Sequence, residues 1–159
     1  MQSRGLPAKP KYKIKDFDKD IDTLVRKIKR SKVEFSYIVA LSRGGLIPGV
    51  VLSHKLGLRL VPISWSTRDH QDRESNCWIP EDVNNGKKVL VVDDIIDSGE
   101  ALKTMFEDWS SSVSPKLNSE NIYVASLIYN KDQSIVPNFY GTKISRKKVP
   151  EWFEFWWEV

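Results

Sequence analysis

Three carboxylates and a glycine turn follow the most hydrophobic run of the sequence, within residues 89–105 (VLVVDDIIDSGEALKTM). Asp93 and Asp94 come directly after four apolar residues. Such a pair can accept hydrogen bonds from a vicinal diol or hold Mg²⁺, directly or through water. An adjacent aspartate pair taken alone is equally typical of solvated or helix-capping residues, so its meaning depends on the residues that follow.

Asp97, Ser98 and Gly99 follow at the junction between an expected strand and an expected helix. Successive backbone N–H groups at such a junction, aided by the helix dipole, form a cradle for an anion. Ser98 adds a hydroxyl donor, and Gly99 lets the backbone approach a ligand oxygen closely. A phosphate site beside a diol-binding acid pair describes a ribose 5-phosphate ligand.

The elements that must position these residues alternate along the chain. Buried strands are expected at residues 35–41, 58–64, 87–93 and 121–129. Amphipathic helices are expected after an N-cap at Asp16 and at residues 46–57 and 101–109. This alternation predicts an α/β fold, a mostly parallel sheet flanked by helices, in which Pro62 indicates that its strand lies near an edge or ends early. Ligands bind beyond the carboxyl ends of such strands, where residues 42–45, the acidic segment and Lys131 all fall.

The length and composition fit one domain. The chain has 159 residues, enough for one buried core and too few for two, and 40% of them are hydrophobic. Residues 1–15 are expected to form an extended arm and residues 16–159 a single domain. The polar stretch 65–86 is expected to be a long functional loop, or in part a hairpin in which Trp78 and Ile79 anchor a short strand.

The sequence shows no apolar run of about 20 residues and no signal-peptide core, which favours a cytoplasmic protein. Cys77 is the single cysteine, so neither an internal disulfide nor a cysteine metal site is expected. The net charge is +4, with basic clusters at residues 26–32 and 143–148. These clusters fit solvated faces or attraction of phosphorylated ligands, and without a recognisable nucleic-acid motif they do not by themselves predict DNA or RNA binding.

The segment VLVVDDIIDSG resembles the phosphoribosyl pyrophosphate signature of type I phosphoribosyltransferases. ALSRGGLIPG resembles the pyrophosphate-binding loop of the bacterial xanthine-guanine enzymes of this family, and SWSTRD stands where those enzymes have a mobile lid. SLIYNKD and VPEWFEFWWEV resemble their base-binding end. The likeness covers roughly residues 35–159 and implies the type I fold, with a small base-binding hood at about residues 130–159.

This resemblance implies a transferase that moves the 5-phosphoribosyl group from phosphoribosyl pyrophosphate to guanine, xanthine or hypoxanthine, in purine salvage. It implies Mg²⁺ as cofactor and pyrophosphate as the second product. It also implies a homodimer or homotetramer, with no membrane partner. The lid within residues 65–86 would exclude water that would otherwise hydrolyse the cationic ribosyl centre.

The resemblance assigns the sugar, phosphate and metal contacts to the first motif. Asp93 and Asp94 would contact the ribose hydroxyls and Mg²⁺. Ser98 and Gly99 would bind the 5′-phosphate.

The second motif would bind pyrophosphate. Arg43 would stabilise the leaving charge and Gly44 would contact pyrophosphate, while Ser42 shapes a turn at which the family often has a cis peptide bond. Arg68 or Arg73 of the lid would also reach pyrophosphate. An ordinary strand-to-helix turn and a loop with solvated arginines are the alternatives for these segments when each is taken alone.

The third acid of the first motif resembles that of the 6-oxopurine enzymes, since adenine and orotate enzymes and the pyrimidine-operon regulators generally have a neutral residue there. Asp97 would be catalytic by accepting the proton near N7 of the purine as the glycosidic bond forms. Lys131 would donate to the oxygen at C6 and disfavour adenine. A surface position is the alternative for Lys131.

The tryptophan-rich end would complete the base pocket. Trp152 is the candidate for stacking on the base, with main-chain carbonyls near Phe153 and an acid, Glu158, that would also be a metal ligand. The other aromatic side chains of this segment are expected to pack in a core or an interface.

Two residues depart from the family pattern. Ala101 stands where the family usually has a threonine whose hydroxyl binds the 5′-phosphate, and Glu100 beside it would repel phosphate. Two alternatives remain, and Ala101 leaves room for the first, whereas loss of base recognition by Lys131 and Trp152 would indicate the second. One is a phosphoribosyl-pyrophosphate-binding regulator that binds RNA or DNA through the basic clusters, with weak or no transferase activity. The other is an enzyme of this fold that acts on another nitrogenous acceptor.

Overall fold

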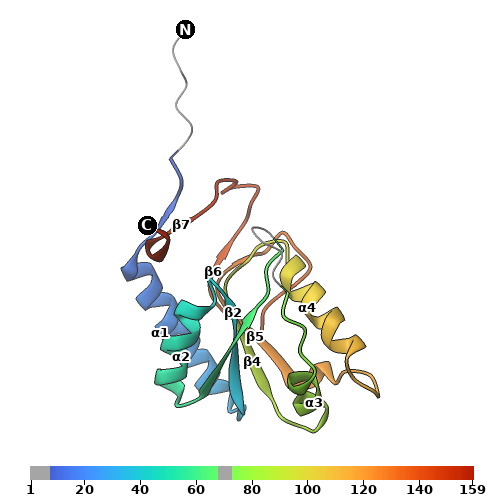
Figure 1. The fold of residues 1–159 in the computed structure, drawn as a ribbon. Coiled ribbons are helices and arrows are strands. Elements are labelled where there is room, and N and C mark those ends of the chain that lie inside the picture. The colour runs from blue at the N-terminus through green and yellow to red at the C-terminus, as the bar shows by residue number, and fades with distance from the viewer. Residues whose placement is uncertain (1–7, 68–72) are drawn as a thin grey trace.

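The computed structural model of the chain describes residues 8–67 and 73–159. Its main sheet has five strands in the order β3-β2-β4-β5-β6, and every neighbouring pair is parallel (Figure 1). The strands are β2 (Tyr37–Ser42), β3 (Arg59–Ser64), β4 (Val89–Ile96), β5 (Ile122–Asn130) and β6 (Phe139–Ile144). The predicted α/β fold is confirmed, and Pro62 lies on an edge strand, as expected.

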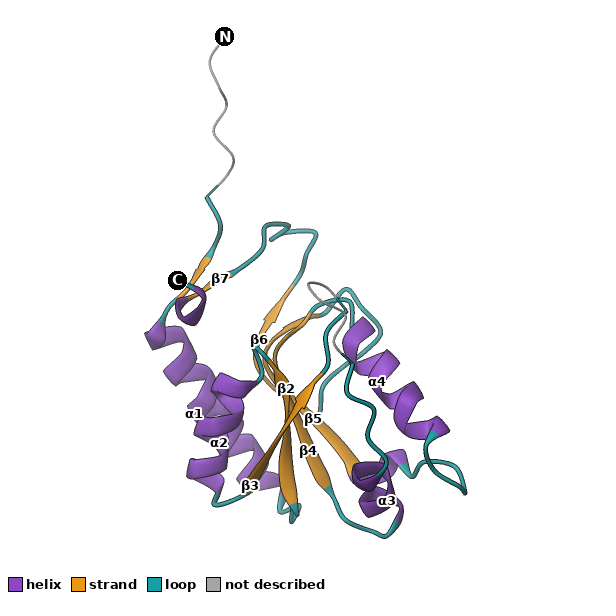
Figure 2. Cartoon of the chain, in the orientation of Figure 1, coloured by secondary structure: helices purple, strands orange, loops and turns teal. Residues whose placement is uncertain are grey.

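Helices cover both faces of this sheet. Figure 2 shows α1 (Ile14–Ser31) and α2 (Leu46–Leu56) on one face and α3 (Trp78–Asn84) and α4 (Glu100–Ser111) on the other. Strand β4 contributes alternately to two cores, with Val89 and Val91 facing α3 and α4 and Leu90 and Val92 facing α1 and α2. Its uninterrupted apolar run is therefore explained by burial on both faces, which is typical of parallel strands.

The last residues of the predicted arm, 1–15, have regular structure. Residues Lys11–Tyr12 form strand β1, which pairs in parallel with β7 (Glu154–Phe155). Helix α1 begins at Ile14, so the prediction of Asp16 as its N-cap was wrong. Asp16 lies in the first turn, where its carboxylate accepts the backbone N–H of Lys13 at 2.9 Å. The buried apolar face starts only at Phe17, which is why the pattern placed the helix start too late.

Part of the predicted loop 65–86 is helical. Helix α3 occupies Trp78–Asn84, so the short strand considered for Trp78 and Ile79 was wrong. The side chain of Asn76 accepts the N–H of Ile79 at 2.9 Å, and Ile79 and Val83 are fully buried, four residues apart on one helix face. No helix in the described ranges is long and apolar enough to cross a membrane.

The aromatic C-terminus packs against the start of the chain. Phe155 is fully buried, and its ring centroid lies 5.2 Å from that of Tyr12 and 4.7 Å from that of Trp157. Phe17 of α1 meets Trp156 and Trp157 edge-on, each at 5.9 Å. These contacts confirm that most of the terminal aromatic residues have a packing role, and they hold the hood segment on the body of the domain.

Candidate active site

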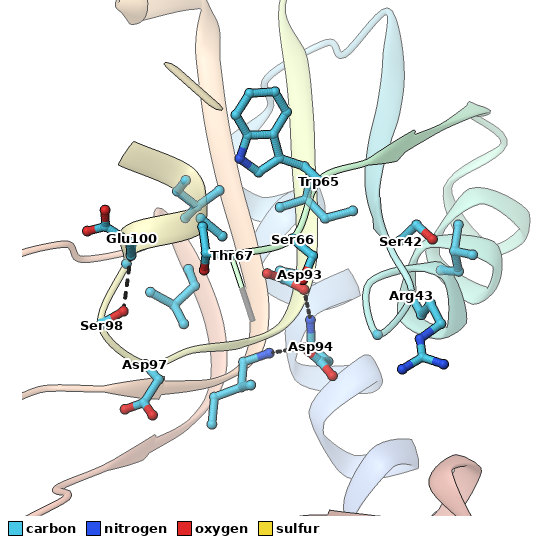
Figure 3. Close-up of a pocket in the computed structure, with 18 of the residues that line it drawn as sticks. Ser42, Arg43, Trp65, Ser66, Thr67, Asp93, Asp94, Asp97, Ser98 and Glu100 are labelled. Atoms are coloured by element: carbon cyan, nitrogen blue, oxygen red, sulfur yellow. Dashed lines mark hydrogen bonds between the residues drawn. The ribbon is translucent and has the colours of Figure 1, made fainter. Parts of the chain in front are cut away.

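A cavity of about 850 Å³ opens at the carboxyl ends of β2, β3 and β4 (Figure 3). Parallel strands end at the same edge of the sheet, so the turns that follow them converge there. The lining comes from three turns and from the C-terminus, and it includes Ser42, Arg43, Gly44, Ser64, Ser66, Thr67, Asp93, Asp94, Asp97, Ser98, Gly99, Glu100, Ala101, Trp152 and Glu158. Ten of the twelve predicted site residues thus lie around one cavity.

The adjacent carboxylates at the end of β4 differ in their environment. Oδ1 of Asp93 accepts the N–H of Asp94 at 2.9 Å, and Oδ1 of Asp94 accepts the N–H of Ile95 at 2.7 Å. Burial of the Asp94 carboxyl raises its pKa, and the negative charge of Glu158 raises it further, while the hydrogen bonds oppose both effects. A ligand cation or a diol that neutralised or hydrogen-bonded Asp94 would relieve this desolvation.

The turn after β2 lies directly against Asp94. A Cβ at Gly44 would overlap Oδ2 of Asp94, and a Cβ at Gly45 would lie 2.5 Å from the carbonyl oxygen of Val92. Both glycines are therefore required by close approach of the backbone. The Ser42–Arg43 peptide bond is cis, as the resemblance implied.

The turn between β4 and α4 contains the residues predicted to cradle an anion. Gly99 has φ 78°, in the left-handed region that favours glycine, and α4 begins at Glu100. The N–H of Glu100 donates to the hydroxyl of Ser98 at 3.3 Å. The N–H groups that follow Glu100 in the first turn of α4 have no acceptor within the helix, and such groups can bind a phosphate. The Glu100 side chain is exposed at the edge of the cradle and faces the same cavity.

Asp97 is held by residues that come from the hood. Its carboxylate forms a two-point ion pair with Arg146, with Nε to Oδ1 and Nη2 to Oδ2 both at 3.1 Å. Nδ2 of Asn130 donates to Oδ1 of Asp97 at 3.2 Å. In Figure 3 the Asp97 carboxylate points away from the Asp93–Asp94 pair. The three acids of the motif therefore serve two separate parts of the cavity.

Two predicted base contacts lie away from the cavity. Lys131 is exposed, and its backbone N–H donates to the carbonyl of Ile144 at 2.9 Å. Phe153 is half-buried, and its ring centroid lies 6.3 Å from that of Phe155. Trp152 and Glu158 do line the cavity, and the Glu158 carboxylate accepts the N–H of Phe155 at 3.2 Å.

No group of three or more His, Cys, Asp or Glu side chains in the described ranges is arranged to hold a metal ion. The predicted metal set of Asp93, Asp94 and Glu158 therefore does not form a complete protein cage. Adjacent carboxylates on an open cavity fit Mg²⁺, which commonly takes one or two carboxylates and fills its other positions with water and substrate oxygens.

The start of the lid is anchored to α4. The indole Nε1 of Trp65 donates to the hydroxyl of Thr104 at 3.0 Å, and the Trp65 side chain is buried. The guanidinium of Arg73 lies 5.7 Å from the centre of the Trp65 ring and does not line the cavity. Arg68, the other arginine considered for pyrophosphate, lies outside the described residues.

Comparison with known proteins agrees with this arrangement. The sequence model of the phosphoribosyl transferase domain family matches residues 12–159 of the chain. The chain belongs to this family. Xanthine-guanine phosphoribosyltransferase of Idiomarina loihiensis is 35% identical over 78 residues, which are 46% of this chain and 48% of that protein. The corresponding protein of Vibrio vulnificus strain YJ016 is 37% identical over 71 residues, 44% of this chain and 46% of that protein. The chain thus spans about half the length of the curated relatives it matches.

Solved structures share the fold over nearly the whole chain. A purine phosphoribosyltransferase from Pyrococcus horikoshii superposes with a TM-score of 0.67 at 26% identity, covering 95% of this chain and 94% of that one. A xanthine-guanine-hypoxanthine phosphoribosyltransferase from Helicobacter pylori gives a TM-score of 0.69 at 23% identity, covering 96% of this chain and 95% of that one. The type I phosphoribosyltransferase fold inferred from the motifs is confirmed.

Arg146 contacts the predicted site residue Asp97 and was not itself predicted from the sequence. It belongs to the basic cluster 143–148, which fitted either a solvated face or attraction of phosphorylated ligands. The signal lay in that cluster, but only the return of the chain after β6 brings one of its cations to Asp97, 49 positions away.

Proposed function

We propose that this chain is a Mg²⁺-dependent phosphoribosyltransferase that transfers the 5-phosphoribosyl group from phosphoribosyl pyrophosphate to a 6-oxopurine base and releases pyrophosphate. The observation that carries the proposal is the convergence of the Asp93–Asp94 pair, the Ser98–Gly99 turn and the Arg43–Gly44 turn on one cavity. The names of the xanthine-guanine relatives support guanine and xanthine as acceptors.

In this proposal the sugar phosphate lies along the end of β4. The backbone N–H groups at the start of α4 and the Ser98 hydroxyl bind the 5′-phosphate, and Gly99 leaves room for its oxygens. Asp93 and Asp94 accept hydrogen bonds from the two ribose hydroxyls. This orientation fixes C1′ between the pyrophosphate turn and the base pocket, which is where most of the catalytic gain from positioning arises.

Pyrophosphate departs toward the turn after β2. Arg43 stabilises the charge that develops on the leaving group, and the backbone around Gly44 contacts its oxygens. Mg²⁺, held by Asp93 and Asp94 together with substrate oxygens, would supply further charge neutralisation. Ser66 and Thr67, which line the cavity at the start of the lid, close the site on the water side.

The base enters between Asp97 and Trp152. Trp152 stacks on the purine, and Asp97 takes the proton from the imidazole ring as the new bond forms. Contacts of Lys131 with the oxygen at C6, and of the Phe153 carbonyl with the opposite edge, require the hood 130–159 to move toward the base. Glu158 would then bound the pocket near the Asp93–Asp94 pair.

The regulator alternative is not favoured. It relied on free cations in the clusters 26–32 and 143–148, and Arg146 of the second cluster faces inward to Asp97. The same Arg146–Asp97 ion pair connects Asp97, the acid found at this position in the 6-oxopurine enzymes, to the rest of the proposed base site.

A base panel tests the proposal. The purified chain is incubated with Mg²⁺, phosphoribosyl pyrophosphate and guanine, xanthine or hypoxanthine, and the nucleotide product is measured chromatographically. We expect at least one base to be converted, no conversion after chelation of divalent cations, and a dimer or tetramer in sedimentation. Absence of product with all three bases, while phosphoribosyl pyrophosphate still binds, would overturn the proposal.

A further inference from the structure

Arg146 uses its guanidinium to join two halves of the base site. Two of its nitrogens contact Asp97, and Nη1 donates to the carbonyls of Glu151 at 2.6 Å and Val149 at 3.3 Å. Arginine carries five donor hydrogens in a rigid planar fork, and these four bonds use most of them. One side chain thus fixes the turn after β4 to the segment that ends at Trp152.

The same guanidinium lies against the stacking candidate. Its central carbon is 5.1 Å from the centre of the Trp152 ring and 5.8 Å from that of Phe153, both within the range of a cation–π contact. Because Arg146 also holds the carbonyl of Glu151, it sets both the position of the backbone before Trp152 and the surroundings of its ring. The distance from Asp97 to Trp152, between which the base must fit, therefore depends on Arg146.

The Arg146–Asp97 ion pair is partly shielded from solvent, which strengthens its electrostatic attraction. The side chains of Arg146 and Asp97 are 16% and 22% exposed, so water and salt screen the pair less than an exposed one. The two-point geometry adds orientation to charge, because both carboxylate oxygens are engaged. The carboxylate that faces the base pocket is consequently held in one rotamer and is balanced by a positive charge.

We propose that Arg146 is the positioning and specificity-determining residue of the base site, acting through Asp97 and Trp152. This inference rests on the proposed function. Arg146 aligns the proton acceptor with the stacking ring, so its loss weakens base binding while the phosphoribosyl pyrophosphate half stays intact. Its positive charge also offsets the negative charge of Asp97, which matters for xanthine, because xanthine loses a proton near neutral pH and hypoxanthine does not. Without Arg146, the Asp97 carboxylate would repel the xanthine anion more strongly.

Three variants separate geometry from charge. Arg146→Met removes both, and we expect the KM for hypoxanthine to rise about 10-fold or more, as for loss of charged hydrogen bonds, with the KM for phosphoribosyl pyrophosphate within about 2-fold of wild type. The KM for xanthine should rise more than that for hypoxanthine. Arg146→Lys keeps the charge and loses the fork, so both KM values should rise by similar factors. Lys148→Met makes the same charge change on an exposed neighbour and should alter neither.

The outcomes divide cleanly. Unchanged KM values for both bases in Arg146→Met, or an equal rise in the KM for phosphoribosyl pyrophosphate, would overturn the inference while the proposed function stands. A xanthine to hypoxanthine ratio that is the same in the Met and Lys variants would overturn its charge component. If the wild-type chain converts and binds none of the three bases, the proposed function fails and the inference falls with it. Melting temperature is recorded for each variant, and if Arg146→Met does not fold, Arg146→Lys decides the positioning component.

Discussion

The acids at the end of β4 lie within five residues of one another and yet belong to two differently built regions. The Asp94 carboxylate accepts a hydrogen bond from the N–H of the next residue, Ile95. The turn that contains Gly44 packs directly against the same carboxylate. The Asp97 carboxylate accepts hydrogen bonds from the side chains of Asn130 and Arg146, which lie 33 and 49 positions away in the sequence. The proposed ribose and phosphate region is thus made mainly by short turns at strand ends, whereas the proposed base region also draws on the end of β5 and on the segment after β6. The residues of both regions can be read from motifs, but the contacts of Asp97 with Asn130 and Arg146 cannot.

Asp97→Asn should have the largest effect and should fall on the base region alone. Removing the proton acceptor is expected to lower kcat by about 100-fold or more, in line with general base catalysis. The KM for phosphoribosyl pyrophosphate should stay within about 2-fold of wild type, since the pocket of Asp93 and Asp94 does not depend on Asp97. Steady-state kinetics with both substrates varied measures this, and normal turnover would show that Asp97 is not the acceptor.

Gly44→Ala should break the other region. The new methyl group would overlap the Asp94 carboxylate, so the turn or the acid must move, and we expect kcat/KM for phosphoribosyl pyrophosphate to fall about 100-fold. Base affinity, measured by calorimetry, should change little. If the variant instead lost base affinity first, the two regions would not be independent.

Asp20→Asn tests how the hood is supported beneath the base region. The buried Asp20 carboxylate accepts the hydroxyl of Tyr12 at 2.6 Å and that of Thr142 at 2.8 Å, which links β1, α1 and β6. Burial raises its pKa, against the lowering effect of these bonds. The folded state therefore binds the Asp20 proton more tightly than the unfolded state does, and the stability that this proton contributes is full below the unfolded value near pH 4 and declines as pH rises through the folded pKa.

Urea unfolding from pH 4 to pH 7 measures this effect. The free energy of unfolding of wild type should fall relative to that of Asp20→Asn as the pH rises, because the variant has no carboxyl to ionise. Asp18→Asn, an exposed change on the same helix, should show a weaker slope. A wild-type stability that rises relative to Asp20→Asn over this range would reverse the assignment.

Ala101→Thr should have the smallest effect and sharpen the phosphate site. A hydroxyl in the first turn of α4 would add one hydrogen bond to the 5′-phosphate, worth about 1 kcal/mol, or roughly a 5-fold lower KM for phosphoribosyl pyrophosphate. Ala101→Val adds similar bulk without the hydroxyl and serves as the matched control. An equal gain in both variants would mean that packing, and not the hydroxyl, limits phosphate binding at this turn.

Prediction from the sequence succeeded where the signal was local. The parallel sheet follows from the alternation of strands and helices along the chain, and the turn after β2 and the acidic turn before α4 each follow from a motif of a few adjacent residues. It failed at residues 78–84, which form a helix because Asn76 and a buried face favour one locally. It also gave no indication that Arg146 of the charged cluster turns inward to Asp97, because those two residues are neighbours in space and distant in sequence.

The sequence by itself determined the chemistry available at the end of β4: carboxylates for a diol and a cation, and a glycine turn for a phosphate. Those groups are neighbours along the chain, so their positions in the sequence are enough to place them close together in space. Only the tertiary structure decided the partners of Asp97. The return of the chain through β6 to the hood brings a cation to that acid and a ring beside the cation, and no periodicity or spacing encodes an approach between residues 97, 146 and 152.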